Sequence, residues 1–172
     1  MKREQLEFID QFIYDFLYNH ADIMPKRLGK LIALYYTDAR IRKRYSHFIG
    51  LEMGEGTFAN LGLNIVPNDN AICVHIGKNV SIAPNVTFLG GTEPNNGKEI
   101  RKIPHIVQKN IYYKDIYVED EAWLGTGCII FPGITIGKCA VIGAGSVVMK
   151  DVEDYAVYAG APAKRIRILQ EI

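Results

Sequence analysis

Hydrophobic residues follow two different periods along this chain of 172 residues. Between residues 4 and 20 they are spaced three or four apart, as on one face of an α-helix. This face consists of Leu6, Ile9, Phe12, Ile13, Phe16 and Leu17. Pro25 can begin a second helix, because its fixed φ suits a first turn, and we expect that helix to extend to about Tyr45. The pattern predicts an α-helical appendage over residues 1–50, followed by loops and short strands up to about residue 70.

From Ile76 onward an aliphatic or aromatic residue returns every six positions. The positions in phase are Ile76, Ile82, Phe88, Val118, Leu124, Ile130, Ile136, Ile142 and Val148. Glycine often follows directly, and four places after each position lies a small or β-branched residue. Neither an α-helix nor an ordinary strand has this period, whereas a coil of short strands joined by tight turns does. We therefore predict an all-β main domain over residues 51–172, a parallel β-helix in which glycine permits the bends.

The six-residue rhythm stops between Phe88 and Val118 and then resumes in phase. The interruption begins with the stretch "FLGGTEPNNGKEIR", and we expect an excursion loop over about residues 89–116. The wall of a β-helix is nearly featureless, so a projecting loop can build a pocket on it. A variable surface loop without a role is the alternative. Loops of this length inside compact domains are more often functional or disordered.

The composition and net charge argue against several classes of protein. The chain is 48% hydrophobic with a formal charge of +1, so we expect a buried core and no charge-driven binding of nucleic acid. No apolar run approaches the ~18 residues of a membrane span, and the first residues lack the apolar stretch of a signal peptide. The three cysteines fit no zinc spacing, and we expect reduced thiols in a cytoplasmic protein.

Several segments resemble the hexapeptide-repeat acyltransferases, and most closely their galactoside and maltose O-acetyltransferase group. They are "FANLGLNIV", "IGKNVSIAPNVTF", "VEDEAWLGTGCIIFPGITIGKCAVIGAGSVVMKDV" and "AGAPAKRIR". The resemblance implies a left-handed parallel β-helix and a homotrimer with active sites at subunit interfaces. It also implies transfer of acetyl from acetyl-CoA to a saccharide hydroxyl, without a metal. The excursion would then reach a neighbouring subunit and help to form the acceptor site.

The residue expected to act as the catalytic base is replaced in this sequence. In the related enzymes a histidine followed by proline takes the proton of the hydroxyl, and Glu93 stands at that position before Pro94. Burial in an apolar cleft could raise the pKa of Glu93 and make it competent. His105 in the same loop could take the role instead. An amine acceptor, which attacks in its neutral form, would need less help.

The resemblance also assigns binding residues. Asn60 matches an acceptor-binding asparagine, and Asp69 is the nearest match to an acceptor-binding aspartate. The coenzyme A groove would be lined by Trp123, Thr126 and Ala144, and its phosphates would meet Lys150, Lys164 and Arg167. The γ-class carbonic anhydrases share this type of coil but need three histidines on zinc. Only His75 and His105 lie in the coil region here, so we set that function aside.

A run of basic residues, Arg40, Arg42, Lys43 and Arg44, leaves two interpretations open. It could attract an anionic acceptor such as a phosphorylated or nucleotide-linked sugar, or it could be a solvated helix face. Two functions also compete with O-acetylation. One is N-acetylation of an amino sugar, which the missing histidine favours. The other is a β-helix that serves as a binding or assembly module and binds no acyl-CoA.

Overall fold

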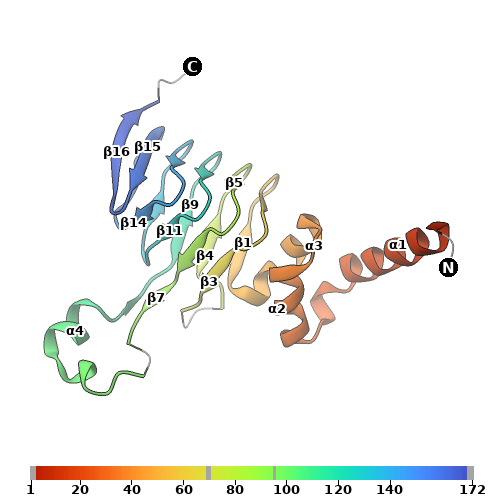
Figure 1. Cartoon of the computed structure of the whole chain (residues 1–172), viewed down its shortest axis with the longest axis horizontal. Helices are drawn as coiled ribbons and strands as arrows, with labels where there is room; N and C mark the ends of the chain where they lie inside the picture. Colours follow the sequence, from red (N-terminus) through yellow and green to blue (C-terminus); the bar gives the residue numbers. More distant parts are fainter. Residues whose placement is uncertain (1–2, 69–70, 95, 170–172) are drawn as a thin grey trace.

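The structure, a computed structural model, describes residues 3–68, 71–94 and 96–169. Its first part is a set of short helices gathered at one end of the molecule, with α1 extending away from the rest (Figure 1). The elements are α1 (Arg3–Asn19), η1 (Ala21–Ile23), α2 (Lys26–Tyr35), α3 (Ala39–Arg44) and η2 (Ser46–Ile49). No helix in these described ranges is both long and apolar enough to cross a membrane.

The prediction of one helix from Pro25 to about Tyr45 is wrong, because α2 ends at Tyr35 and α3 begins anew. Asp38 causes the new start. Its side chain accepts hydrogen bonds from the backbone amides of Arg40 and Ile41, which caps the first turn of α3. The break separates α3, which packs against the first turn of the β-helix, from α2, which packs against α3 and η2.

The basic run on α3 contacts the protein itself. Arg42 is buried and donates hydrogen bonds to the carbonyls of Tyr36, Thr37 and Ala59, so it joins the helices to the first coil. The other cations of the run also have local contacts: Arg40 with Asp38, Lys43 with the Gly54 carbonyl and the Phe58 ring, and Arg44 with Tyr18. The run is neither a fully solvated face nor a free anion-binding patch.

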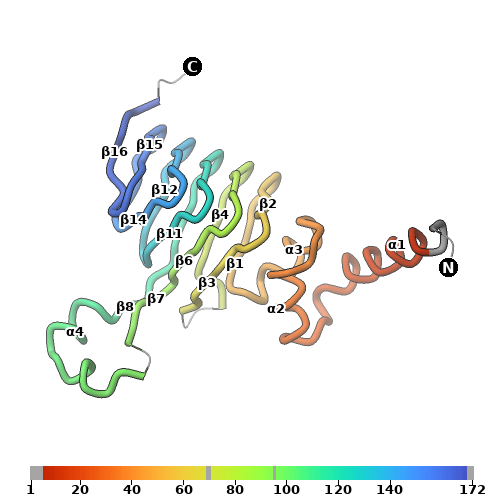
Figure 2. The backbone as a smooth tube through the Cα atoms, viewed as in Figure 1, coloured from red at the N-terminus to blue at the C-terminus, as the bar shows by residue number. Residues whose placement is uncertain are grey.

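The main body is a coil whose successive strands belong in turn to three parallel sheets (Figure 2). The first sheet holds β1 (Leu51–Met53), β4 (Val74–Ile76), β9 (Ile116–Val118) and β12 (Thr135–Ile136). The second holds β2 (Phe58–Ala59), β5 (Ser81–Ile82), β10 (Trp123–Leu124), β13 (Val141–Ile142), β15 (Ala156–Gly160) and β16 (Ala163–Ile168), the last antiparallel to β15. The third holds β3 (Asn64–Val66), β6 (Thr87–Leu89), β11 (Ile129–Ile130) and β14 (Val147–Val148). This is the predicted parallel β-helix.

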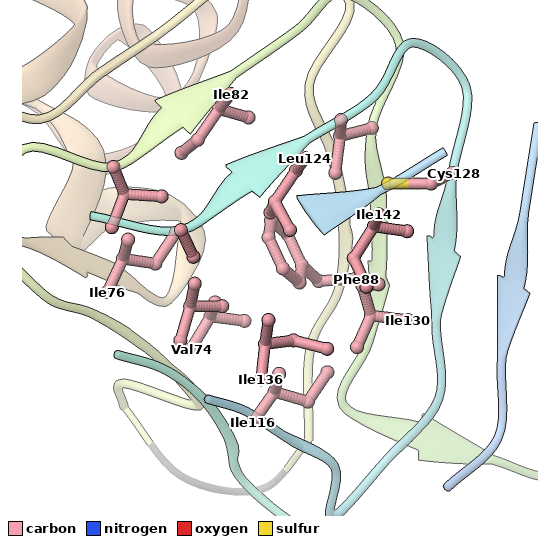
Figure 3. Packing of buried hydrophobic residues seen from close by; sticks show 14 of the residues in the cluster. Val74, Ile76, Ile82, Phe88, Ile116, Leu124, Cys128, Ile130, Ile136 and Ile142 are labelled. Carbon is pink, nitrogen blue, oxygen red and sulfur yellow. The ribbon is translucent and has the colours of Figure 1, made fainter. Parts of the chain in front are cut away.

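The six-residue pattern marks the interior of the coil. All nine in-phase residues are buried, the most exposed being Ile76 at 5%. Side chains from the three sheets meet along one axis, as Phe88, Leu124, Ile130 and Ile136 do in Figure 3. The residues four places later are buried as well wherever the coil is uninterrupted: Val80, Val86, Ala122, Cys128, Ile134, Ala140 and Ser146. One continuous apolar core therefore joins the stacked coils.

The sequence predicts that the glycines directly after the aliphatic positions permit the bends. In the structure these glycines instead allow successive coils to stack closely. A Cβ on Gly125 would lie 2.6 Å from the amide nitrogen of Ala144, in the next coil, so the side chain is excluded by stacking. The left-handed bend lies two residues further on, at Gly127 with φ +68°. At the turn between the first and second sheets Gly56 makes the same bend in the first coil, and Asn79, Glu121 and Cys139 make it in the later coils.

The excursion is more ordered than a plain loop. Its stem is an antiparallel pair of β7 (Gly91–Thr92) and β8 (Tyr112–Tyr113), and its tip carries η3 (Ile100–Lys102) and α4 (Pro104–Lys109). It leaves the coil after β6 and returns at β9. In Figure 1 it projects on the side away from β5.

Candidate active site

A cavity of about 410 Å³ lies on the outer face of the second sheet. Phe58, Ser81 and Trp123 stand in register on three neighbouring strands, and all three line it. Adjacent strands are about 4.8 Å apart, so the two aromatic residues are about 9.6 Å apart with a small serine between them. Trp123 is 57% exposed. Such a slot can receive one flat ring against aromatic walls.

Asn60 lies at the rim of the same cavity. Its Nδ2 donates to the carbonyl of Ile82 at 3.0 Å, which fixes the amide next to the slot. Two predicted site residues, Asn60 and Trp123, are therefore brought together, although they come from different coils. The prediction for Asp69 lies outside the described residues.

Thr126 and Ala144 lie on successive coils at the turn that follows the second sheet. The amide of Gly145 donates to the carbonyl of Thr126 at 2.8 Å, and the amide of Gly127 donates to Pro84 at 3.0 Å, so the turns are stacked. Thr126 and Ala144 are both exposed. This column of small side chains leaves a shallow strip of surface against which an extended chain can lie.

The three predicted phosphate-binding cations lie toward the C-terminal end of the coil. Lys150 is exposed just after β14, and Lys164 and Arg167 are exposed on β16 opposite Ala159 and Val157. Their neighbour Arg165 is different, because it forms an ion pair with Glu153 at 2.6 Å, which raises its pKa. Lys164 and Arg167 thus extend from the strand that closes the second sheet, at the end opposite the helices (Figure 1).

Glu93 directly follows β7 in the excursion and is held there by two groups. A hydrogen bond from the Tyr113 hydroxyl, and then one from the Arg101 guanidinium, lower the pKa of the Glu93 carboxyl below its ordinary value. The expected rise in pKa through burial is therefore not found. Glu93 lines a second cavity of about 510 Å³, together with apolar residues such as Phe131 and Met149.

His105 is exposed in the first turn of α4. Neither His105 nor Glu93 is among the residues that line the slot of Phe58, Ser81 and Trp123. The single chain therefore brings Asn60 and Trp123 together in the slot but leaves both candidate bases on the excursion.

His75 points outward from the first sheet, as alternation along the strand predicts. Its Nδ1 lies 2.5 Å from Glu52 Oε1, its Nε2 lies 3.6 Å from Asp115 Oδ2, and its ring stacks on Tyr117. These contacts link neighbouring coils. Across the described ranges the structure has no group of three or more residues that could hold a metal ion.

Four residues of these sites were not singled out in the sequence. Phe58 and Ser81 could have been found from strand register, since each stands directly before an inward residue as Trp123 does. Arg101 and Tyr113 leave no such signal, because their contact with Glu93 depends on how the excursion folds.

Comparison with known proteins finds relatives of this chain both by sequence and by structure. No family model matches it. It is 38% identical to a galactoside O-acetyltransferase of Lactococcus lactis over 120 residues, which cover 69% of this chain and 54% of the relative. It is 32% identical to the galactoside O-acetyltransferase of Escherichia coli over 166 residues, which cover 92% of this chain and 76% of that protein.

A solved galactoside acetyltransferase in complex with coenzyme A superposes with a TM-score of 0.64 at 31% identity, covering 84% of this chain and 81% of that one. The coil and these matches define a hexapeptide-repeat acyltransferase. Within that class the chain belongs to the galactoside O-acetyltransferase family. It spans only about half the length of the Lactococcus relative.

Proposed function

We propose that this protein transfers an acetyl group from acetyl-CoA to a hydroxyl of a saccharide. One observation carries the proposal: Asn60 and Trp123, which resemble acceptor and cofactor residues of the family, line one aromatic-walled slot. Family membership and the galactoside acetyltransferase solved with coenzyme A support the donor. A saccharide ring fits a slot with flat apolar walls and a polar rim.

In this reaction the acceptor oxygen attacks the thioester carbonyl, the carbon–sulfur bond breaks, and the hydroxyl proton passes through a base to the departing thiolate. Asn60, with Asp69, orients the acceptor. The pantetheine arm lies along Thr126 and Ala144, and the phosphates meet Lys150, Lys164 and Arg167. Free, buried thiols at Cys73 and Cys128 suit a reducing cytoplasm.

The active form is a homotrimer of left-handed coils. Its support is the separation of the candidate bases from the slot, since the excursion projects on the side away from β5 (Figure 1). A base on the excursion of one subunit would complete the slot of its neighbour. Either Glu93 or His105 then takes the hydroxyl proton.

A second function, N-acetylation of an amino sugar, is favoured by the state of Glu93. A carboxylate whose pKa is lowered by Tyr113 and Arg101 is a weak base for a neutral hydroxyl. A neutral amine attacks without prior deprotonation. N-acetylation would be identified by two results together. Acetylation of an amino sugar slows below the pKa of its free amine, and the sugar with a hydroxyl in place of that amine is not acetylated.

Calorimetric titration with acetyl-CoA tests the donor without assuming an acceptor. We expect saturable binding near one site per chain, lost in the double variant Lys164→Ala/Arg167→Ala. The variant Lys78→Ala/Lys138→Ala removes the same charge from exposed turn residues and should bind normally. A folded trimer that gives no binding heat would contradict the proposal and favour a non-enzymatic assembly module.

The acceptor is tested next, with a panel of sugars and the variants Glu93→Gln and His105→Gln. Whichever residue is the base, its variant should lose about 100-fold or more in rate. The other variant should stay near wild type. Equal, small effects in both would reject a base on the excursion.

A further inference from the structure

The slot of Phe58, Ser81 and Trp123 has one wall at the edge of its sheet. β2 is the last strand of the second sheet, so Phe58 has β5 on one side and no further described strand on the other. Trp123, the opposite wall, stands on a strand that is paired on both sides. Beyond β2 lies the helix α3, which packs against it (Figure 2). Phe58 is 42% exposed, so support for this wall has to come from outside the sheet.

That support comes from Lys43 on α3. Its Nζ lies 5.1 Å from the centre of the Phe58 ring, within the range of a cation–π interaction. The same ammonium donates a hydrogen bond to the carbonyl of Gly54, in the turn that leads into β2. Loss of solvent lowers the pKa of Lys43, while the charge of Glu55 acts in the opposite direction. A partly desolvated ammonium attracts an aromatic ring more strongly than a hydrated one does.

The backbone on both sides of this contact is fixed. Arg42, which precedes Lys43, donates to the carbonyl of Ala59, the residue after the aromatic ring, at 2.6 Å. The amide of Gly54 donates to the carbonyl of Ile76 in the next coil at 2.8 Å. The ammonium of Lys43 is therefore anchored to the same segment of the coil that carries the ring.

This segment supplies a large part of the slot. Gly56, Phe58 and Asn60 all line it, whereas Lys43 is not among its described lining residues. Asn60 has a fixing contact of its own, the hydrogen bond from its side chain to the carbonyl of Ile82. The contact that links Lys43 to the slot is therefore the one with the Phe58 ring.

We propose that Lys43 is a positioning residue of the acceptor site, which holds the Phe58 ring in place as one wall of the slot. This inference rests on the acyl transfer proposed above. Without the ammonium, the ring at the edge of the sheet gains rotational freedom, and a bound saccharide has to order it again. The helical appendage is then part of the acceptor site as well as a cover for the end of the coil.

Steady-state acetylation of methyl β-galactopyranoside by the full-length protein tests this role. Lys43→Met keeps the length of the side chain but removes its charge and its hydrogen bond. We expect KM for the sugar to rise about fivefold or more, with kcat and KM for acetyl-CoA within about twofold of wild type. Lys43→Gln, which also lacks the charge, takes its place if that variant does not fold. An unchanged KM for the sugar would overturn the proposal.

Two further variants show whether the charge is the cause. Lys43→Arg keeps a cation that donates hydrogen bonds, and its KM for the sugar should stay within about twofold of wild type. Lys138→Met removes a positive charge from an exposed turn and should behave as wild type does. If Lys43→Arg were as impaired as Lys43→Met, the charge would not be what holds the ring, and the proposal would fail.

A double-variant cycle shows whether Lys43 acts through the ring. Phe58→Ala removes the wall, so adding Lys43→Met to it should raise KM for the sugar no further. Effects that multiply in the double variant would mean that Lys43 affects the sugar by another route. That result would also overturn the proposal.

A measurement without substrate separates this inference from the acyl transfer. NMR signals of the Phe58 ring, assigned with labelled phenylalanine and the variant Phe58→Leu, should move in Lys43→Met and stay in place in Lys138→Met. If wild type acetylates no sugar but the signals respond in this way, the acyl transfer fails and the support of the ring stands. If the sugar is acetylated and the ring signals do not respond, the acyl transfer stands and this inference fails.

Discussion

The guanidinium of Arg42 donates a hydrogen bond to the backbone carbonyl of Ala59 at 2.6 Å, across the boundary between α3 and the first coil. Arg42 is only 7% exposed, and its other contacts are also carbonyls, those of Tyr36 and Thr37. A cation with three carbonyl acceptors is satisfied without a carboxylate. The helices are thus fixed to the coil through a polar contact as well as through apolar packing.

Replacing Arg42 by methionine should lower the free energy of unfolding by about 2–4 kcal/mol, because buried carbonyls lose their donor. Urea unfolding at fixed protein concentration measures this. Arg27→Met, at an exposed position of α2, is the control and should change stability by less than about 0.5 kcal/mol. If Arg42→Met changed the free energy of unfolding only slightly, water would donate hydrogen bonds to these carbonyls in place of the guanidinium.

Two glycines of one turn should respond differently to alanine. Gly125→Ala forces a Cβ to within 2.6 Å of backbone atoms of the next coil, so we expect a loss above about 2 kcal/mol. Gly127→Ala meets nothing within 4 Å and carries only the strain of positive φ, about 1–2 kcal/mol. Urea unfolding of both variants compares them. If Gly127→Ala were the more destabilising variant, the positive φ rather than close stacking would explain why glycine is needed in this turn.

The contacts of Glu93 predict how the stability of the protein depends on pH. Because the folded-state pKa of Glu93 is lowered, its contribution to stability is present above the ordinary carboxyl pKa and is lost as pH falls through the folded value. The difference in unfolding free energy between wild type and Glu93→Gln should therefore shrink on acidification from neutral pH to about pH 3. Unfolding curves at several pH values measure it. A difference independent of pH would show that the carboxylate charge plays no part.

The three cysteines should differ in how fast their thiols react with an alkylating reagent. Burial raises the pKa of Cys128 to about 12, and Cys73 is also buried with a raised pKa, whereas Cys139 is partly exposed. Brief treatment of native protein with iodoacetamide at pH 8 should modify Cys139 first, as peptide mass spectrometry would show. In denaturant all three should react alike. Rapid native labelling of Cys128 would mean that the coil opens easily.

The sequence allowed the core of the coil from Ile76 onward to be predicted nearly residue by residue, because a period of six admits one arrangement of inward side chains. It did not allow the break at Asp38 to be predicted, since a single cap competes with an otherwise continuous helical pattern. Trp123 and Asn60 could be placed by motif. The partners of Glu93, Tyr113 and Arg101, could not, because their contacts depend on how the excursion folds.

A stack of parallel coils has exposed backbone at both ends, and each end could in principle add another chain without limit. Here one end is covered by α3, tied down by Arg42. At the other end the chain reverses, so that the second sheet finishes with antiparallel β16, bearing Lys164, Arg165 and Arg167. An incoming strand could not continue the parallel pairing of the coil there, and it would meet an edge that carries the exposed cations Lys164 and Arg167. Both edges of the second sheet are therefore covered or charged, which disfavours pairing with a strand of another chain.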